Sequence, residues 1–314
     1  MVSRKRKVAM LSVYSNTFLV VLKFITGFLM GSVSVISEGI HSAIDLVAAI
    51  IANYSVKKSE EPADERHPYG HGKFENYAGV IEAILIFIAA AIIVYESGLR
   101  LIFGSEVEFL IAGLAIMALS AVINYFVSRK LYQVGKEEDS MALVADGLHL
   151  RTDVLTSIGV FLGLMAITIT GWTFLDPIIA IGVALLIVKA SIDLTREASK
   201  GLVDETLPDE DLGKIETVLY NHREYFEGFH ALRTRKSGAE RFIDLHLVMR
   251  PDVKLNDAFR VCRHLEDEIS GSMPKTNVMI RCEPSDFEDL EGHLGDYYLI
   301  DKETRETDFK DKKD

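Results

Sequence analysis

Hydrophobic residues gather in six long stretches within the first 200 positions, and short polar links separate them. Each stretch is long enough to cross a hydrocarbon core of about 30 Å as a helix. The stretches cover residues 8–30, 33–56, 77–101, 109–127, 141–170 and 174–194. This pattern predicts an all-α transmembrane domain of six spans over residues 1–200.

Lysine and arginine are confined to alternate links between the predicted spans. The segment before the first span is basic, as are the links after the second and fourth spans. The links after the first, third and fifth spans hold no lysine or arginine. By the positive-inside rule, the basic links lie in the cytoplasm. We therefore expect a multi-pass protein of the cell (inner) membrane, embedded in the lipid bilayer, with both termini cytoplasmic.

After residue 200 the hydrophobic pattern becomes that of a small soluble domain. Apolar positions with helical spacing over 212–219 and 258–269 predict two helices, and alternation over 241–249 predicts a strand. Residues 277–283 have the pattern of a last strand. We expect one α+β domain with a single core over residues 201–286. The acidic and aperiodic remainder, residues 287–314, is predicted to be disordered.

Composition narrows the class of function. The chain is 49% hydrophobic and still 25% charged, which is typical of a membrane domain joined to a soluble one. A net charge of -12 argues against a nucleic-acid partner. The only two cysteines, Cys262 and Cys282, lie late in the chain and give no disulfide framework.

Two histidine–aspartate pairs lie inside predicted spans, where ionisable residues are costly and usually functional. The second span contains His41 and Asp45, and the fifth contains His149 and Asp153. Spacing of i, i+4 places both members of a pair on one helix face. Asp45 precedes Val56 by 11 positions and Asp153 follows Met141 by 12, so both lie about 17 Å from the cytoplasmic ends. The two pairs are therefore predicted to meet near the midplane.

Two imidazoles and two carboxylates form a competent tetrahedral shell for zinc. The alternative interpretation is that each pair is a buried polar bridge that fixes helix packing. Metal and protons compete for such ligands, because histidine must be neutral and aspartate ionised to bind a metal. The hypothesis is export of a divalent metal ion in exchange for protons by alternating access. Zinc is then the transported ion and a candidate regulatory ion, and no organic cofactor is expected.

The link after the second span, residues 62–73, reads P-A-D-E-R-H-P-Y-G-H-G-K. Asp64, His67 and His71 are candidates for a second metal site at the mouth of the transport domain. Ordinary polar loop chemistry is the alternative, because loops favour such residues.

The sequence resembles the cation diffusion facilitator family over nearly the whole chain up to about residue 286. Four segments carry the resemblance: S-E-G-I-H-S-A-I-D, the 62–73 link, A-D-G-L-H-L-R-T-D, and L-V-D-E-T-L-P-D-E at 202–210. It implies a six-span homodimeric exporter with a metallochaperone-like, ferredoxin-like cytoplasmic domain. It places the transport site on the same four side chains and implies a loop site at Asp64, His67 and His71. Histidine in both spans is similar to the zinc- and cadmium-transporting members. The resemblance also implies a charge interlock between Lys73 and Asp204 near the dimer interface.

The soluble domain departs from the family pattern. His230 and His246 match two histidine positions on the strands of metal-binding members. Arg281 stands where a zinc-type member has a further histidine, followed by Cys282 and Glu283, and the helix position that can carry histidine is Phe259. A site formed by His230, His246, Cys282 and Glu283 is one interpretation. The other is that the histidines are polar surface residues and that the domain serves dimerisation.

Other function classes remain to be weighed. A membrane-embedded zinc hydrolase would also use histidine and aspartate, but the sequence has no H-E-x-x-H run, and a closed four-ligand site leaves no position for an activated water. We therefore do not expect an enzyme. A non-transporting metal-sensing scaffold is a further alternative. The same ligands also accept cadmium, cobalt, iron(II) or manganese, so the sequence indicates the transport site more strongly than it indicates which metal is transported.

Overall fold

The fold is described from a computed structural model of the full chain. The described residues are 3–30, 33–103, 111–170, 172, 174–286 and 298–299. The chain divides into two compact units, residues 1–202 and 203–314. The predicted class, a helical membrane domain followed by a small α+β domain, is confirmed.

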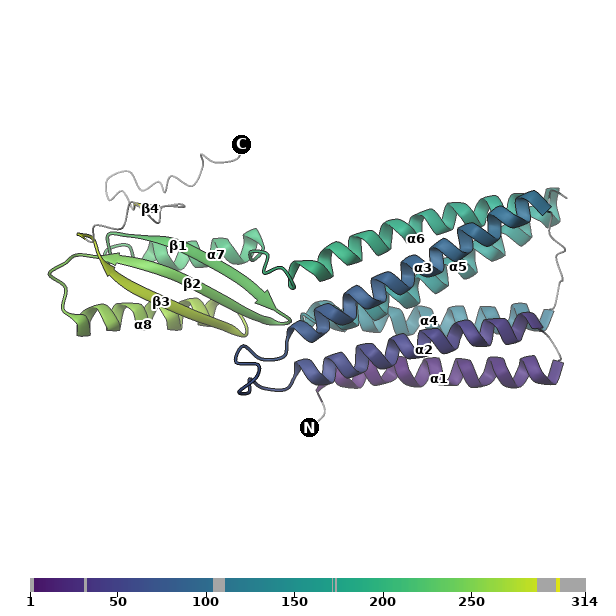
Figure 1. The fold of residues 1–314 in the computed structure, drawn as a ribbon, viewed down its shortest axis with the longest axis horizontal. Coiled ribbons are helices and arrows are strands. Elements are labelled where there is room, and N and C mark those ends of the chain that lie inside the picture. The colour runs from purple at the N-terminus through teal and green to yellow at the C-terminus, as the bar shows by residue number, and fades with distance from the viewer. Residues whose placement is uncertain are drawn as a thin grey trace. The chain divides into compact units, whose positions relative to one another are not determined.

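The first unit consists of long helices that follow the predicted apolar stretches (Figure 1). They are α1 Arg4–Met30, α2 Val33–Ser59, α3 Lys73–Phe103, α4 Ile111–Glu137, α5 Met141–Thr170 and α6 Leu175–Lys200. Within the unit, α1 packs mainly on α2, α4 on α5, and α3 on α6. Among the described residues, α1, α2, α3 and α6 contain segments long and apolar enough to cross a membrane.

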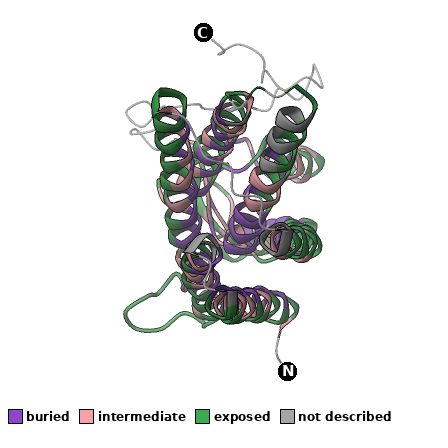
Figure 2. Cartoon of the chain, turned by 90° about the vertical axis from the view of Figure 1, so that its right-hand side faces the viewer, coloured by how far each residue is buried: buried purple, intermediate pink, exposed green. Residues whose placement is uncertain are grey.

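The outer surface of this unit is apolar. Ile44 on α2 is 50% exposed, and Leu185 and Leu186 on α6 are 60% and 63% exposed. Figure 2 shows such exposed positions on the outer sides of the helices and the buried positions between them. Large exposed apolar surface is expected where lipid replaces water.

Glycines let α4 and α5 approach closely. A Cβ atom on Gly135 would lie 2.8 Å from the backbone nitrogen of Val144, and one on Gly147 would lie 2.9 Å from the backbone nitrogen of Tyr132. Small residues at such crossings are typical of membrane helix pairs. This contact fixes α5, which carries one of the two histidine–aspartate pairs.

A fully hydrogen-bonded acid lies near the start of α3. Glu75 is 1% exposed, and its Oε1 atom accepts hydrogen bonds from Lys5 Nζ at 3.0 Å and from Ser59 Oγ at 2.6 Å. Ser140 Oγ donates to the other carboxylate oxygen, Oε2. Because every partner is present, this buried charge holds α1, α2, α3 and the start of α5 together.

The second unit is a sheet with two helices. Its elements are α7 Asp209–Asn221, β1 Gly228–Ser237, β2 Glu240–Met249, α8 Leu255–Ser272, β3 Thr276–Pro284 and β4 Tyr298–Leu299. The strand order is β3-β2-β1-β4, with β2 and β3 parallel and the other pairs antiparallel. The pattern of the sequence did not indicate β1 or β4. Tyr298 and Leu299 fall within the tail predicted to be disordered, and the rest of 287–314 lies outside the described residues.

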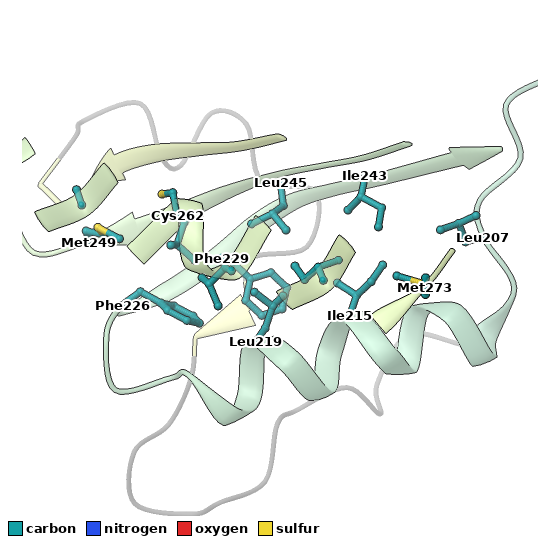
Figure 3. Packing of buried hydrophobic residues seen from close by; sticks show 14 residues of the cluster. Leu207, Ile215, Leu219, Phe226, Phe229, Ile243, Leu245, Met249, Cys262 and Met273 are labelled. Carbon is teal, nitrogen blue, oxygen red and sulfur yellow. The ribbon is translucent and has the colours of Figure 1, made fainter. Parts of the chain in front are cut away.

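Both helices pack against one face of the sheet. Ile215 and Leu219 from α7 and Leu265 from α8 are fully buried with Phe229 and Leu245 from the strands. Figure 3 shows this core between α7 and the strands. Since successive side chains of a strand point to opposite faces, the buried alternation of β2 turns its other residues to the uncovered face.

Candidate metal centres

The predicted transport residues of α2 and α5 converge within the first unit. One ligand atom from each of His41, Asp45 and Asp153 can be chosen so that all three lie within 4.8 Å of one another. Each helix presents its pair on one face because the members are one turn apart. Two helices far apart in the sequence thus supply donors to one small volume.

His149 joins this group through Asp45. Its Nε2 atom lies 3.1 Å from Asp45 Oδ1, and both residues are 5% exposed. His41 is exposed and Asp153 is half-buried. The structure therefore brings all four predicted side chains together, although His149 contacts the group through one carboxylate.

Two buried polar atoms of this group, Asp153 Oδ2 and His149 Nδ1, have no hydrogen-bond partner among the described residues. Leaving a buried polar atom unsatisfied costs about 1–3 kcal/mol. A polar bridge that only fixed helix packing would satisfy its atoms, so this arrangement favours a site whose donors await a ligand.

Glu82 on α3 is a neighbour that the sequence analysis did not select. It is fully buried, its Oε2 atom lies 3.5 Å from His149 Nδ1, and neither carboxylate oxygen has a hydrogen-bond partner among the described residues. A carboxylate behind a metal-binding imidazole fixes the orientation of that ring. The sequence holds one signal for Glu82. Its neighbours on the buried side of the helix, Gly79, Ala83 and Ile86, are small or apolar, which indicates that this acid is buried.

Two more charged residues lie buried near the pairs. Asp146 is 1% exposed and precedes His149 by one turn, with Ser12 as a hydrogen-bond partner. Lys23 is 5% exposed and donates to Ser42 Oγ at 2.8 Å, next to His41. The region is therefore rich in ionisable groups of both signs.

The predicted loop residues also form a group. Asp64, His67 and His71 each place a ligand atom within 4.8 Å of the others. Asp64 Oδ1 accepts from the backbone N–H groups of Arg66 at 2.9 Å and His67 at 2.7 Å, and the His67 backbone bond lowers the pKa of that carboxyl. His71 Nε2 lies 3.5 Å from Asp64 Oδ2. Gly70 has a φ of 78°, which a larger residue adopts only with strain.

A third group lies on the sheet face that the helices leave uncovered. Glu283 Oε2 lies 2.9 Å from His230 Nε2, and its Oε1 lies 3.1 Å from His246 Nδ1. Burial lowers the pKa of His246, which favours the neutral imidazole that binds metal. Arg281 Nε also lies 3.1 Å from Glu283 Oε1, so a guanidinium competes for the same carboxylate.

Cys282 is not part of this third group, contrary to the sequence interpretation. It follows Arg281 and precedes Glu283 on β3, so its side chain points to the opposite face, toward α8. Its Sγ lies 3.9 Å from the Ala258 carbonyl oxygen, and a hydrogen bond with the Cys262 thiol lowers its pKa. Because side chains alternate along β3, Cys282 and Glu283 lie on opposite faces of the sheet and cannot bind the same ion.

The remaining predictions concern Phe259, Lys73 and Asp204. Phe259 on α8 is 64% exposed and offers no metal ligand. Lys73 begins α3 in the first unit, whereas Asp204 belongs to the second, where its Oδ1 lies 3.5 Å from Arg235 Nη1. The interlock between Lys73 and Asp204 stays a prediction.

Comparisons with known proteins agree with both units. Residues 9–203 match the family model described as the cation efflux transmembrane domain, and residues 207–285 match the cation efflux protein cytoplasmic domain. An uncharacterized transporter of Synechocystis sp. is 32% identical over 279 residues, which cover 89% of this chain and 90% of the relative.

Two further relatives carry more specific names. The cation-efflux pump FieF of Klebsiella pneumoniae is 29% identical over 85% of this chain and 88% of its own length. The magnetosome protein MamB of Magnetospira sp. is 29% identical over 80% of this chain and 85% of its own length.

Proposed function

The chain belongs to the cation efflux, or cation diffusion facilitator, family, and on that premise we propose that it exports zinc from the cytoplasm in exchange for protons. His41, Asp45, His149 and Asp153 are the transport ligands. The observation that carries the proposal is the buried contact of 3.1 Å between Asp45 on α2 and His149 on α5. Two imidazoles and two carboxylates suit a borderline-soft ion that prefers tetrahedral nitrogen and oxygen ligands.

Proton exchange follows from the chemistry of these donors. Zinc binds neutral imidazole and ionised carboxylate, so each ion that enters the site displaces protons, and protons that enter from the other side release it. The buried, unsatisfied oxygens of Asp153 and Glu82 are places where such protons can reside. Alternating access then couples an inward proton gradient to outward movement of zinc.

The surroundings of the site complete the proposal. The protein spans the inner cell membrane with both termini in the cytoplasm, in keeping with its basic links. The second unit joins two copies into a homodimer, which the Lys73–Asp204 interlock stabilises. The loop group at Asp64, His67 and His71 binds zinc at the mouth of the domain and supplies the transport ligands.

Zinc flux into vesicles tests this function. The purified full chain is placed in liposomes that contain a zinc-sensitive dye, and an imposed pH gradient drives uptake. Asp45→Ala and Asp153→Ala should each lower flux to the level of empty vesicles, because a ligand is lost. Asp193→Ala, an exposed acid on α6, is the matched control and should keep the flux of the natural chain.

The outcomes separate the alternatives. Flux that ignores the pH gradient would contradict proton exchange but not export. Zinc binding without any flux in the natural chain would favour a metal-sensing scaffold. Faster flux of cadmium, cobalt, iron(II) or manganese than of zinc would reassign the metal.

A further inference from the structure

A fourth histidine group lies on the helix side of the second unit, away from His230 and His246. His222 caps the C-terminal end of α7, and His264 and Glu268 lie one turn apart on α8. One ligand atom from each of the three lies within 4.8 Å of the others. None of these residues takes part in the centres described above.

The two imidazoles face each other through their Nε2 atoms. His222 Nε2 lies 3.1 Å from His264 Nε2. His222 Nδ1 lies 3.0 Å from the Val218 carbonyl oxygen, which can only accept a hydrogen bond. The Nδ1 atom of His222 must therefore carry the proton, and its Nε2 lone pair points toward His264. Metal-binding histidines are commonly fixed in this way by a carbonyl behind the ring.

The spacing also suits a metal ion. Tetrahedral zinc with nitrogen ligands at about 2.0–2.1 Å separates two nitrogens by about 3.3–3.4 Å, close to the observed 3.1 Å. Glu268 Oε2 lies 3.5 Å from His222 Nδ1, and its side chain is 44% exposed, so the carboxylate can turn toward the shared volume. Three protein ligands then leave a fourth position for water.

A surface contact between two aromatic rings explains less. The rings are 4.9 Å apart at 74°, a T-shaped arrangement. A hydrogen bond from the Nε2–H group of His264 to the lone pair of His222 Nε2 also accounts for the 3.1 Å contact, but neither it nor the ring contact requires a carboxylate beside the two rings.

We propose that His222, His264 and Glu268 bind a divalent transition-metal ion of the zinc type and thereby fasten the end of α7 to α8. The site lies entirely within the second unit and uses none of the transport ligands. Because the ion binds only the folded arrangement, its occupancy stabilises this unit when metal accumulates. The domain would then bind metal between its helices as well as on its sheet.

Histidine footprinting with diethyl pyrocarbonate tests the site on the full chain in detergent, with zinc chloride as the probe. Mass spectrometry follows His222 and His264 separately from the other histidines. With free zinc tenfold above the dissociation constant, both should react about tenfold more slowly, by mass action. The Asp45→Ala, Asp153→Ala double variant should show the same protection, so loss of transport and loss of this site are distinguishable.

Matched variants on α8 decide the assignment. His264→Gln should abolish protection of His222, and His264→Cys should restore it, because a thiolate also binds zinc. Glu268→Gln should weaken protection, whereas Asp267→Asn, an exposed neighbour paired with Arg263, should leave it unchanged. Equal reactivity with and without zinc in the natural chain, or full protection of His222 in His264→Gln, would overturn the proposal.

Discussion

The buried polar groups around Glu75 and around His149, both in the first unit, differ in whether their hydrogen bonds are satisfied. Around Glu75, every charge has its partner, with Lys5, Ser59 and Ser140 all donating to one carboxylate. Around His149, by contrast, Glu82 keeps both oxygens without a hydrogen-bond partner among the described residues. A satisfied group stabilises the fold. An unsatisfied one, held in place by the rest of the fold, is prepared for a ligand.

The largest expected effect concerns the satisfied group. Lys5→Met leaves the Glu75 carboxylate buried without its cation, and it should lower the free energy of unfolding by about 3–5 kcal/mol. Arg4→Ala is the matched control. Its ion pair with Glu137 is half exposed and should contribute only about 0–1 kcal/mol. Thermal unfolding of the two variants in detergent measures the difference, and equal losses would refute the structural role of the Glu75 group.

A smaller effect is expected at Glu82, and it concerns zinc affinity rather than the stability of the fold. Glu82→Gln removes the carboxylate behind His149 and should weaken zinc binding at the transport site by about 10–100-fold. The melting temperature should not fall, because the Glu82 carboxylate makes no hydrogen bond with the described residues that the amide would lose. Glu96→Gln, exposed on the same helix, is the control. Unchanged zinc affinity in Glu82→Gln, measured by titration, would remove Glu82 from the site.

The smallest effect is expected on the sheet of the second unit, where Arg281 competes with a metal ion for the Glu283 carboxylate. Arg281 forms an ion pair with Glu283, so Arg281→His removes the competing cation and adds an imidazole that can bind the metal. Zinc affinity of the group should rise by about tenfold, or about 1.4 kcal/mol. Arg281→Gln separates the two contributions because it removes only the charge. If neither variant binds zinc more tightly, His230 and His246 do not form a zinc site.

Periodicity explains which of these features the sequence could predict. The pairs His41–Asp45 and His149–Asp153 are visible because both members lie on one apolar helix, and their equal depth predicts that they meet. Long apolar stretches predict the helices for the same reason. Arg241–Met249 alternates, so β2 is also visible, whereas the bulge in β1 near His230 interrupts its pattern.

Contacts between distant segments that no paired motif marks could not be predicted. Glu82 is a lone acid whose role comes from packing of α3 beside α5, and His222 and His264 are 42 positions apart. Cys282 was misplaced for a simpler reason. Adjacent residues of a strand cannot both face one site, so Glu283 and Cys282 were mutually exclusive ligands.

Zinc X-ray absorption on the full chain tests the central claim most directly. His71→Ala, His230→Ala and His264→Ala together disable the other three groups, so that only the transport ligands can hold the ion. The account predicts one zinc per chain with two imidazole nitrogens at about 2.0–2.1 Å and two carboxylate oxygens at about 2.0–2.2 Å. Loss of bound zinc in this variant while its flux persists, or a shell of water oxygens alone, would contradict it.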